Sequence, residues 1–194
     1  DYLVRQISAQ LKETPEGHTL RMLSVACGPS MEWQKLITAM PDPEQPVHVD
    51  LLDQDEGALQ FAQRRLKTLA SQYPNNVQFR FIRKAIRNII AAGLDDQEYD
   101  LIYTAGLFDY LSDPVAFKAA YQLFQSLRPG GRLIIGNFNV NHPDEALMDY
   151  VLDWHLIYRS DTDLEALFAE VGGTVEIHKE PLDINLFCVI TKDG

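Results

Sequence analysis

Two stretches decide the fold of this chain: RMLSVACGPS (21–30) and VHVDLLDQD (47–55). Each begins with a short apolar run suited to one buried strand. The first run stops at Gly28-Pro29 and the second at Asp53, which are residues typical of turns and helix starts. Residues 31–40 between them are expected to form a helix. A strand, a helix and a second strand in this order predict parallel strands joined by a helical crossover.

The same alternation continues along the rest of the chain. The expected strands are 21–26, 47–52, 77–82, 100–105, 132–138, 174–179 and 185–191. The expected helices are 2–12, 31–40, 55–71, 86–92, a helix capped by Asp113 that ends before Arg128, 143–159 and 161–170. No helix separates the last two strands, so one of them is expected to be antiparallel. The pattern predicts an α/β fold: a single doubly wound, mostly parallel seven-stranded sheet with one antiparallel strand near the C-terminus.

Length and composition favour one folded domain over 1–194, with a helix and loop in 1–19. The chain has 194 residues, of which 46% are hydrophobic and 23% charged. Its net charge of −11 disfavours binding to nucleic acid or to anionic membranes, whereas a cationic or neutral ligand is compatible with it. Because the chain does not begin with Met, we expect it to be processed or taken from a longer protein.

Targeting signals, membrane spans and metal-binding motifs are not evident in the sequence. No apolar run reaches the 18 or more residues of a membrane span, and the N-terminus has no signal-peptide core. The two cysteines, Cys27 and Cys188, form no CxxC pair, and this favours a reducing, cytoplasmic compartment. The five histidines are scattered, so no metal site is predicted.

Ligands of open α/β sheets bind at the carboxyl ends of the strands, and two loops there carry informative residues. The loop 26–30 has one glycine, fewer than the GxGxxG of a dinucleotide site; it is either a tight turn or a loop shaped for a close ligand. Asp53 either accepts hydrogen bonds from the two hydroxyls of a ribose or caps the next helix. Together these loops suggest a nucleoside without phosphates. S-adenosylmethionine fits that description, and its sulfonium cation suits an acidic chain.

Four segments in order resemble the class I, Rossmann-like S-adenosylmethionine-dependent methyltransferases. They are LSVACGPS (23–30), Asp53 followed by Leu59 and Ala62, YDLIYTAGLFDYL (99–111) and LRPGGRLIIGNF (127–138). The resemblance spans about residues 20–192 and implies an enzyme that transfers a methyl group to a small-molecule acceptor. It implies cofactor contacts from Ala26, Cys27, Gly28, Pro29, Asp53, Gln54, Ala85, Ile86, Thr104, Ala105 and Gly106.

The chain also departs from the family pattern. The usual acid of the first motif is Ser24 here, and the first and last glycines of that motif are Ala26 and Ser30. The ammonium of the methionine part is therefore expected to contact backbone carbonyls. The third-strand loop lacks the acid often found against the adenine amine, which leaves backbone and apolar contacts from Ala85 and Ile86.

The segments CGPS, LLDQD, AGLFDYLSD and YVLDWHLIYR resemble the corresponding sequences of a bacterial subgroup that makes a 3-hydroxypalmitate methyl ester. Some of its members carry an additional N-terminal regulatory domain. This resemblance implies a carboxylate acceptor such as a hydroxy fatty acid. A carboxylate nucleophile needs no general base, and the sequence offers no obvious one.

Residues expected to bind the acceptor follow strands four and five: Asp109, Tyr110, His155, Tyr158 and Arg159. In a helix 148–159, His155 and Arg159 would share a face, and Arg159 could bind a carboxylate with two hydrogen bonds. The alternative is structural, with Tyr150 and Trp154 in the core and Arg159 paired with Asp161 or Asp163.

Other interpretations remain open at this level. Cys27 at a helix start could be a nucleophile, or only a small residue that fills the turn. A nucleotide-dependent oxidoreductase would use the same architecture but lacks its pyrophosphate glycines. The altered first loop also suits a non-catalytic scaffold domain. A response regulator would need an acid where the chain has Arg83-Lys84. The oligomeric state is not predicted.

Overall fold

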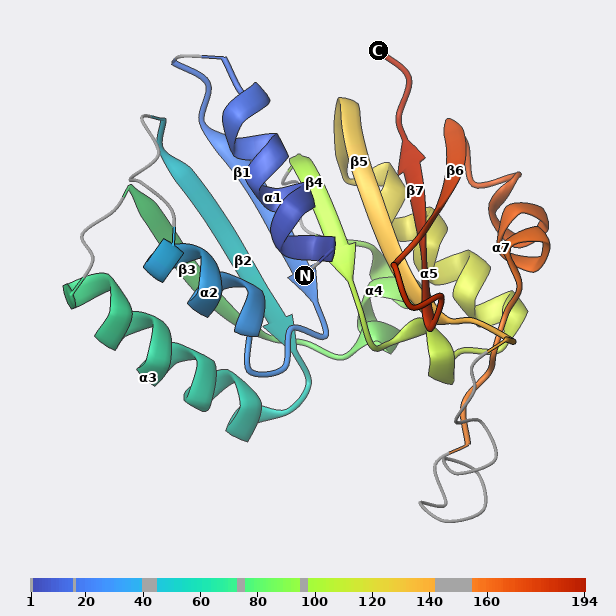
Figure 1. The fold of residues 1–194 in the computed structure, drawn as a ribbon, viewed down its shortest axis with the longest axis horizontal. Helices are drawn as coiled ribbons and strands as arrows, with labels where there is room; N and C mark the ends of the chain where they lie inside the picture. The colour runs from blue at the N-terminus through green and yellow to red at the C-terminus, as the bar shows by residue number, and fades with distance from the viewer. Residues whose placement is uncertain (1, 16, 40–44, 73–75, 95–97, 142–154) are drawn as a thin grey trace.

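A computed structural model describes residues 2–15, 17–39, 45–72, 76–94, 98–141 and 155–194 (Figure 1). The strands are β1 (Leu20–Val25), β2 (Val47–Asp53), β3 (Val77–Arg83), β4 (Tyr99–Thr104), β5 (Leu127–Phe138), β6 (Thr174–Lys179) and β7 (Asn185–Thr191). The helices are α1 (Tyr2–Glu13), α2 (Met31–Ala39), α3 (Glu56–Gln72), α4 (Ile86–Ala92), α5 (Asp113–Gln125) and α7 (Asp161–Phe168), with a short 3₁₀ turn η1 (Phe108–Tyr110).

The strands form one sheet in the order β3-β2-β1-β4-β5-β7-β6. Strands β1 to β5 pair in parallel, and β7 runs antiparallel to both β5 and β6. The predicted doubly wound α/β sheet with one antiparallel strand is therefore confirmed. The strand order reverses between β1 and β4, and such a switch point is where an open α/β sheet binds its ligands.

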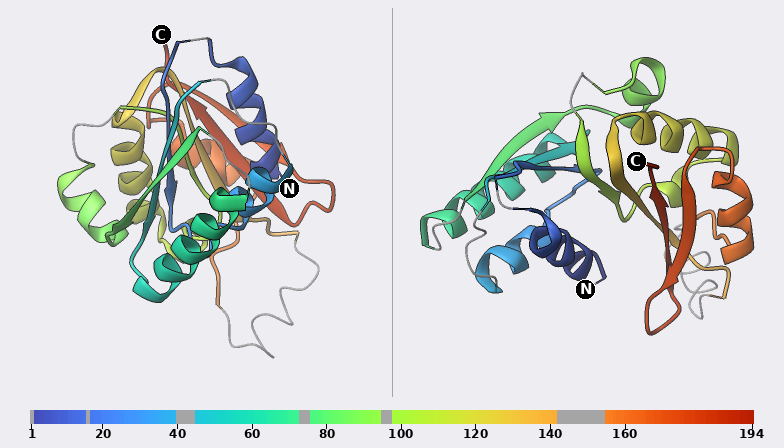
Figure 2. Two further views of the ribbon diagram at one scale, coloured as in Figure 1. Left: turned by 90° about the vertical axis from the view of Figure 1, so that its left-hand side faces the viewer. Right: turned by 90° about the horizontal axis from the view of Figure 1, so that it is seen from above.

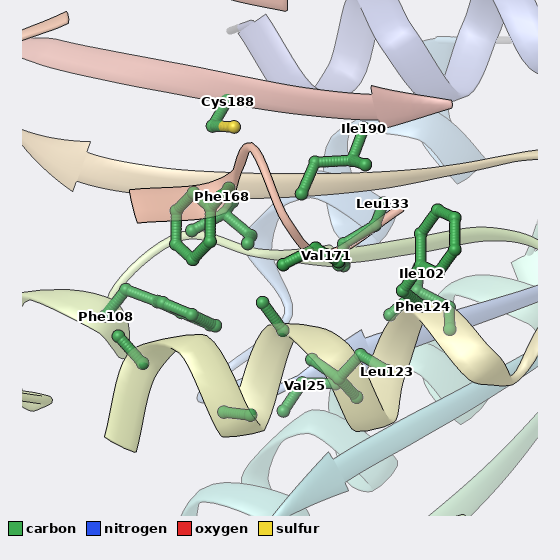
Figure 3. Close-up of a cluster of buried hydrophobic side chains, with 14 of the residues drawn as sticks. Val25, Ile102, Phe108, Leu123, Phe124, Leu133, Phe168, Val171, Cys188 and Ile190 are labelled. Carbon is green, nitrogen blue, oxygen red and sulfur yellow. The ribbon is translucent and has the colours of Figure 1, made fainter. Parts of the chain in front are cut away.

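Helices cover both faces of the sheet, as Figure 2 shows. Helices α1 and α2 pack on one face, where Trp33 and Leu36 meet Met22 and Val49 of the strands. The other face carries α4, α5 and α7 over a second core. Figure 3 shows this core, with strand, α5 and α7 side chains in contact: Val25, Ile102, Leu133, Ile190, Leu123, Phe124 and Phe168. Successive strand residues point to opposite faces, so both faces of β1 are apolar and buried.

Three local expectations are corrected. Residues 155–159 are extended rather than helical, and Arg159 forms a bridge with Asn139 beside the end of β5; the rest of the expected helix 143–159 lies outside the described residues. Strand β5 begins at Leu127 rather than at 132, because Leu127 already pairs with Tyr99 of β4, and a register shift separates this pair from Leu101 and Arg132. Ser112, not Asp113, occupies the N-cap of α5.

Candidate functional site

The loop after β1 is built from alternating left-handed residues. Ala26, Gly28 and Ser30 have φ values of 53°, 50° and 53°. Only glycine adopts this conformation without strain, which costs other residues about 1–2 kcal/mol each. The backbone N–H of Cys27 donates to the Leu52 carbonyl at 3.0 Å, so this strained loop is tied to the end of β2. The loop shape is thus imposed by its surroundings at the two positions where the family pattern has glycine.

Asp53 ends β2 and joins two loops. Its Oδ2 accepts a hydrogen bond from the Gly28 backbone N–H at 2.8 Å, and its Oδ1 accepts one from the Asp55 N–H at 2.9 Å. The helix cap of α3 comes from Asp55, whose Oδ1 accepts from the N–H of Gly57 at 2.7 Å. Asp53 therefore does not cap the helix. A carboxylate oxygen can accept two hydrogen bonds, so each Asp53 oxygen keeps capacity for a ligand donor.

A cavity of about 540 Å³ lies above these loops at the carboxyl ends of β1 to β4. Its polar and backbone lining comes from Ala26, Gly28, Asp53, Gln54, Lys84 and Gly106. Its apolar wall comes from Val25, Leu52, Ile86, Leu107, Tyr110 and Leu111. A small polar floor with a larger apolar wall is typical of sites for small organic ligands.

The cavity brings together six of the predicted cofactor residues: Ala26, Gly28, Asp53, Gln54, Ile86 and Gly106. The others lie around it. Cys27 and Thr104 are buried, and the Pro29 carbonyl accepts from Gln34. Ala85 lines a neighbouring hollow together with Gln54, and Ala105 is exposed.

The sequence reasoning missed two groups of lining residues. Lys84 and Leu107 line the cavity, and only their position directly after β3 and β4 could have indicated them. Leu111 lies further along the chain, and the turn η1 carries it to the cavity.

Cys27 is unsuited to nucleophilic chemistry. Burial, helped by the nearby carboxylates of Asp53 and Glu32, raises the pKa of the Cys27 thiol to about 12. The thiol stays protonated at neutral pH, and a thiol is a far weaker nucleophile than a thiolate. This supports the interpretation of Cys27 as a small residue that fills the turn.

The Arg159 side chain is buried and hydrogen-bonded inside the protein. Only 3% of its surface is exposed. Its guanidinium donates to Asp113 Oδ1 at 2.8 Å and to Asn137 Oδ1 at 2.7 Å. It also donates to the carbonyls of Phe108 at 3.0 Å and Leu111 at 2.6 Å. Arg159 thus joins the loop after β4 to the end of β5, and its acid partner is neither Asp161 nor Asp163.

Of the other predicted acceptor residues, Tyr110 lines the cavity, whereas Asp109, His155 and Tyr158 are not part of its lining. Asp109 is buried in η1, and its Oδ1 accepts from the Phe138 N–H at 2.6 Å. His155 is exposed, and the Tyr158 ring packs edge-on against Phe138. Asp109 and Tyr158 thus contact Phe138 at the end of β5, next to the loops that carry the cavity.

Asp109 provides a test of that supporting role. Asp109→Ala would leave the Phe138 N–H without its acceptor, and we expect a loss of about 1–3 kcal/mol in the free energy of unfolding. Asp109→Asn keeps an acceptor oxygen and should lose less than about 1 kcal/mol at pH 7. Urea unfolding of both variants measures this. Equal losses for alanine and asparagine would contradict the assignment.

The difference in stability between the wild type and Asp109→Asn also depends on pH. Burial raises the pKa of Asp109 from 3.8 to about 6, so the folded protein keeps a proton that the unfolded chain releases between about pH 4 and 6. The stabilisation from this group is complete well below pH 4 and is lost as the pH rises through 6. Relative to Asp109→Asn, the wild type should therefore lose about 2.4 kcal/mol between pH 4 and 7.

The residues present fit an adenosyl cofactor. Gly28 offers a side-chain-free surface, and a Cβ added at Gly28 or Gly106 would meet no atom within 4 Å. Within the described ranges, the one buried side-chain polar atom without a partner is Thr104 Oγ1, at the end of β4 beside the switch point. The same residues contain no group of three His, Cys, Asp or Glu side chains arranged for a metal. Nor does any helix among them have the length and apolar character to cross a bilayer.

Fold and site together define a Rossmann-like α/β protein with an acid-and-glycine site at its switch point. A model of the methyltransferase domain family matches residues 22–131. The chain belongs to this family of methyltransferase domains.

Solved structures show the same fold. The CurJ carbon methyltransferase is 16% identical with a TM-score of 0.75, covering 100% of this chain and 54% of its own. Magnesium protoporphyrin IX methyltransferase from Synechocystis PCC 6803, with bound SAH, is 14% identical with a TM-score of 0.69. The match covers 99% of this chain and 82% of that protein. A protein described as a possible exported protein, from Bordetella parapertussis, is 18% identical with a TM-score of 0.68, and the match covers 98% of this chain and 68% of that protein. The chain thus spans little more than half the length of some of these structures. No curated protein matches the sequence significantly.

Proposed function

We propose that this domain transfers the methyl group of S-adenosylmethionine to a small-molecule acceptor. The observation that carries the proposal is the pairing of Asp53 with Gly28 at the cavity floor. Asp53 keeps acceptor capacity for the two ribose hydroxyls, and the loop backbone leaves room for the rest of the nucleoside. Ile86 provides an apolar surface for the adenine, beside the backbone of Ala85.

The chain's own residues would act by binding and alignment. S-adenosylmethionine, when bound, supplies a methyl group on a positively charged sulfur. Alignment of two reacting groups can lower a barrier by about 7–11 kcal/mol, so methyl transfer needs little further chemistry from the protein. The apolar wall of Leu107, Tyr110 and Leu111 would exclude water above the cofactor.

The acceptor class we favour is a carboxylate with an apolar body, such as a hydroxy fatty acid. The apolar wall of the cavity supports it, because an alkyl chain would gain about 0.8 kcal/mol for each CH₂ that it buries there. Among the described residues, the buried acid nearest in the chain to this wall is Asp109, and its carboxylate is bonded to the Phe138 N–H. A carboxylate acceptor requires no such base.

Calorimetric titration with S-adenosylhomocysteine tests the cofactor. We expect micromolar binding at one site per chain and no binding of NAD, since the loop 26–30 lacks pyrophosphate glycines. Incubation with radiolabelled S-adenosylmethionine and 3-hydroxy fatty acids of increasing length would then identify an ester product.

The same titration separates the alternatives. Binding of NAD would favour an oxidoreductase. Absence of any binding would favour a scaffold domain, the interpretation that the strained Ala26 and Ser30 support.

A further inference from the structure

Glu32, in the first turn of α2, holds a partly buried carboxylate beside the loop 26–30. Its Oε1 accepts a hydrogen bond from the Tyr103 hydroxyl at 2.8 Å and one from the Ser30 hydroxyl at 3.2 Å. Both side-chain donors use the same oxygen. Within the part of the chain that the structure describes, Oε2 has no side-chain donor.

The donors to Glu32 are themselves held in place. The Tyr103 hydroxyl accepts from Trp33 Nε1 at 2.9 Å, and both Trp33 and Tyr103 are almost fully buried. With one hydrogen bond donated and one accepted, the direction of this hydroxyl is fixed. Tyr103 therefore orients Glu32, and Ser24, which stands where the family pattern has an acid, lies opposite Tyr103 on the neighbouring strand.

The charge of Glu32 is not balanced by the protein. Two other partly buried acids in the sheet have cationic partners, since Asp50 pairs with Arg80 and Asp100 with Arg128, whereas Asp53 accepts from backbone N–H groups. No Lys, Arg or His among the described residues forms an ion pair with Glu32. Partial burial raises the pKa of its carboxyl group. An unpaired, partly buried charge is unfavourable, so a cationic ligand group would be bound there with a gain.

Glu32 does not itself line the cavity but is bonded to the loop that does. Ser30, to which it is bonded, ends the loop whose residues Ala26 and Gly28 line the cavity. The charges of Asp53 and Glu32 both help to raise the pKa of the Cys27 thiol, which lies in the middle of this loop. The loop thus has one carboxylate, Asp53, on its β2 side and a second, Glu32, at the helix that follows it.

Resting on the proposed function, we propose that Glu32 is the carboxylate that binds the ammonium group at the amino-acid end of S-adenosylmethionine. The cofactor carries that ammonium at the opposite end from the ribose, which we assign to Asp53. In this assignment the carboxylate that binds the ammonium lies in the first turn of α2, whereas the family pattern has its acid on β1, at the position of Ser24.

Two ligands that differ in the amino-acid part test this assignment. S-adenosylhomocysteine carries the ammonium, whereas 5′-methylthioadenosine has the same nucleoside and sulfur without it. Glu32→Gln keeps an acceptor for Tyr103 and Ser30 but removes the charge. In calorimetric titrations, we expect this variant to bind S-adenosylhomocysteine about tenfold more weakly, while 5′-methylthioadenosine binds within twofold of wild type.

Glu56→Gln is the matched control. Glu56 lies in the first turn of α3 at the same edge of the sheet, is exposed and pairs with Arg83, so its loss should change neither affinity by more than twofold. Unchanged binding of both ligands by Glu32→Gln, or equal weakening of both, would overturn the assignment of Glu32. If the wild type binds neither ligand, the proposed function itself fails. Retained binding of 5′-methylthioadenosine shows that Glu32→Gln is folded.

Discussion

Replacing Arg159 with alanine is expected to lower the free energy of unfolding by about 3–5 kcal/mol, because its buried guanidinium is the donor to several acceptors, whereas its ion-pair partner Asp113 is 69% exposed and contributes little. The substitution would leave the side-chain oxygen of Asn137 and the carbonyls of Phe108 and Leu111 without their donor. Unsatisfied buried acceptors cost about 1–3 kcal/mol each when they cannot reach water. For a protein of this size, the melting temperature should fall by roughly 6–20 °C, measurable by calorimetry.

Arg83→Ala is the control for this prediction. Arg83 pairs with Glu56 at 2.8 Å, but its side chain is 65% exposed, so the loss should stay below about 1 kcal/mol. Arg159→Ala with wild-type stability but a raised Michaelis constant for the acceptor would contradict the structural role. It would instead restore Arg159 as an anchor for an acceptor carboxylate.

Asp53→Ala should weaken S-adenosylhomocysteine binding by about 100-fold or more. Charge-assisted hydrogen bonds are worth about 1.5–3 kcal/mol each, and we assign Asp53 to two ribose hydroxyls. The variant also loses the bond that holds the Gly28 N–H, so the loop 26–30 would be less well ordered for the ligand. Calorimetric titration gives the affinity directly, with 1.4 kcal/mol for each tenfold change.

Asp55→Ala separates binding from folding in this experiment. Asp55 lies two residues away, carries the same charge and caps α3, so alanine should cost about 1 kcal/mol of stability without a large change in affinity. Equal loss of affinity in both variants would indicate that the helix α3, rather than the Asp53 carboxylate, matters for the ligand.

The local pattern was enough to predict most of the fold. Alternating apolar runs and turn residues identify the strands around Val25, Leu52 and Ile102, because burial on both faces of a parallel sheet requires nearly continuous apolar residues. The segment 155–159 was predicted wrongly. Its spacing suits a helix, but the Arg159 backbone N–H donates to the Phe138 carbonyl, and this contact with β5 holds it extended.

The candidate site was predictable where it depends on the order of the strands. Asp53 and Gly28 each follow a strand, and the parallel register of β1 and β2 brings the two strand ends together. The roles of charged side chains were less accessible. Arg159 seemed free to bind a ligand because its partner, Asp113, lies 46 residues away in the chain.

The sequence by itself determined the class of fold, the methyltransferase resemblance and the two loops that form the cavity floor, since these depend on local patterns and on the order of the strands. Only the tertiary structure decided which charges are paired. It placed Arg159 among buried oxygens, and it left the carboxylate of Glu32 beside the loop 26–30 without a cation in the described part of the chain. The physical reason is that charge pairing depends on distances across the sheet, and these arise only when the strands assemble.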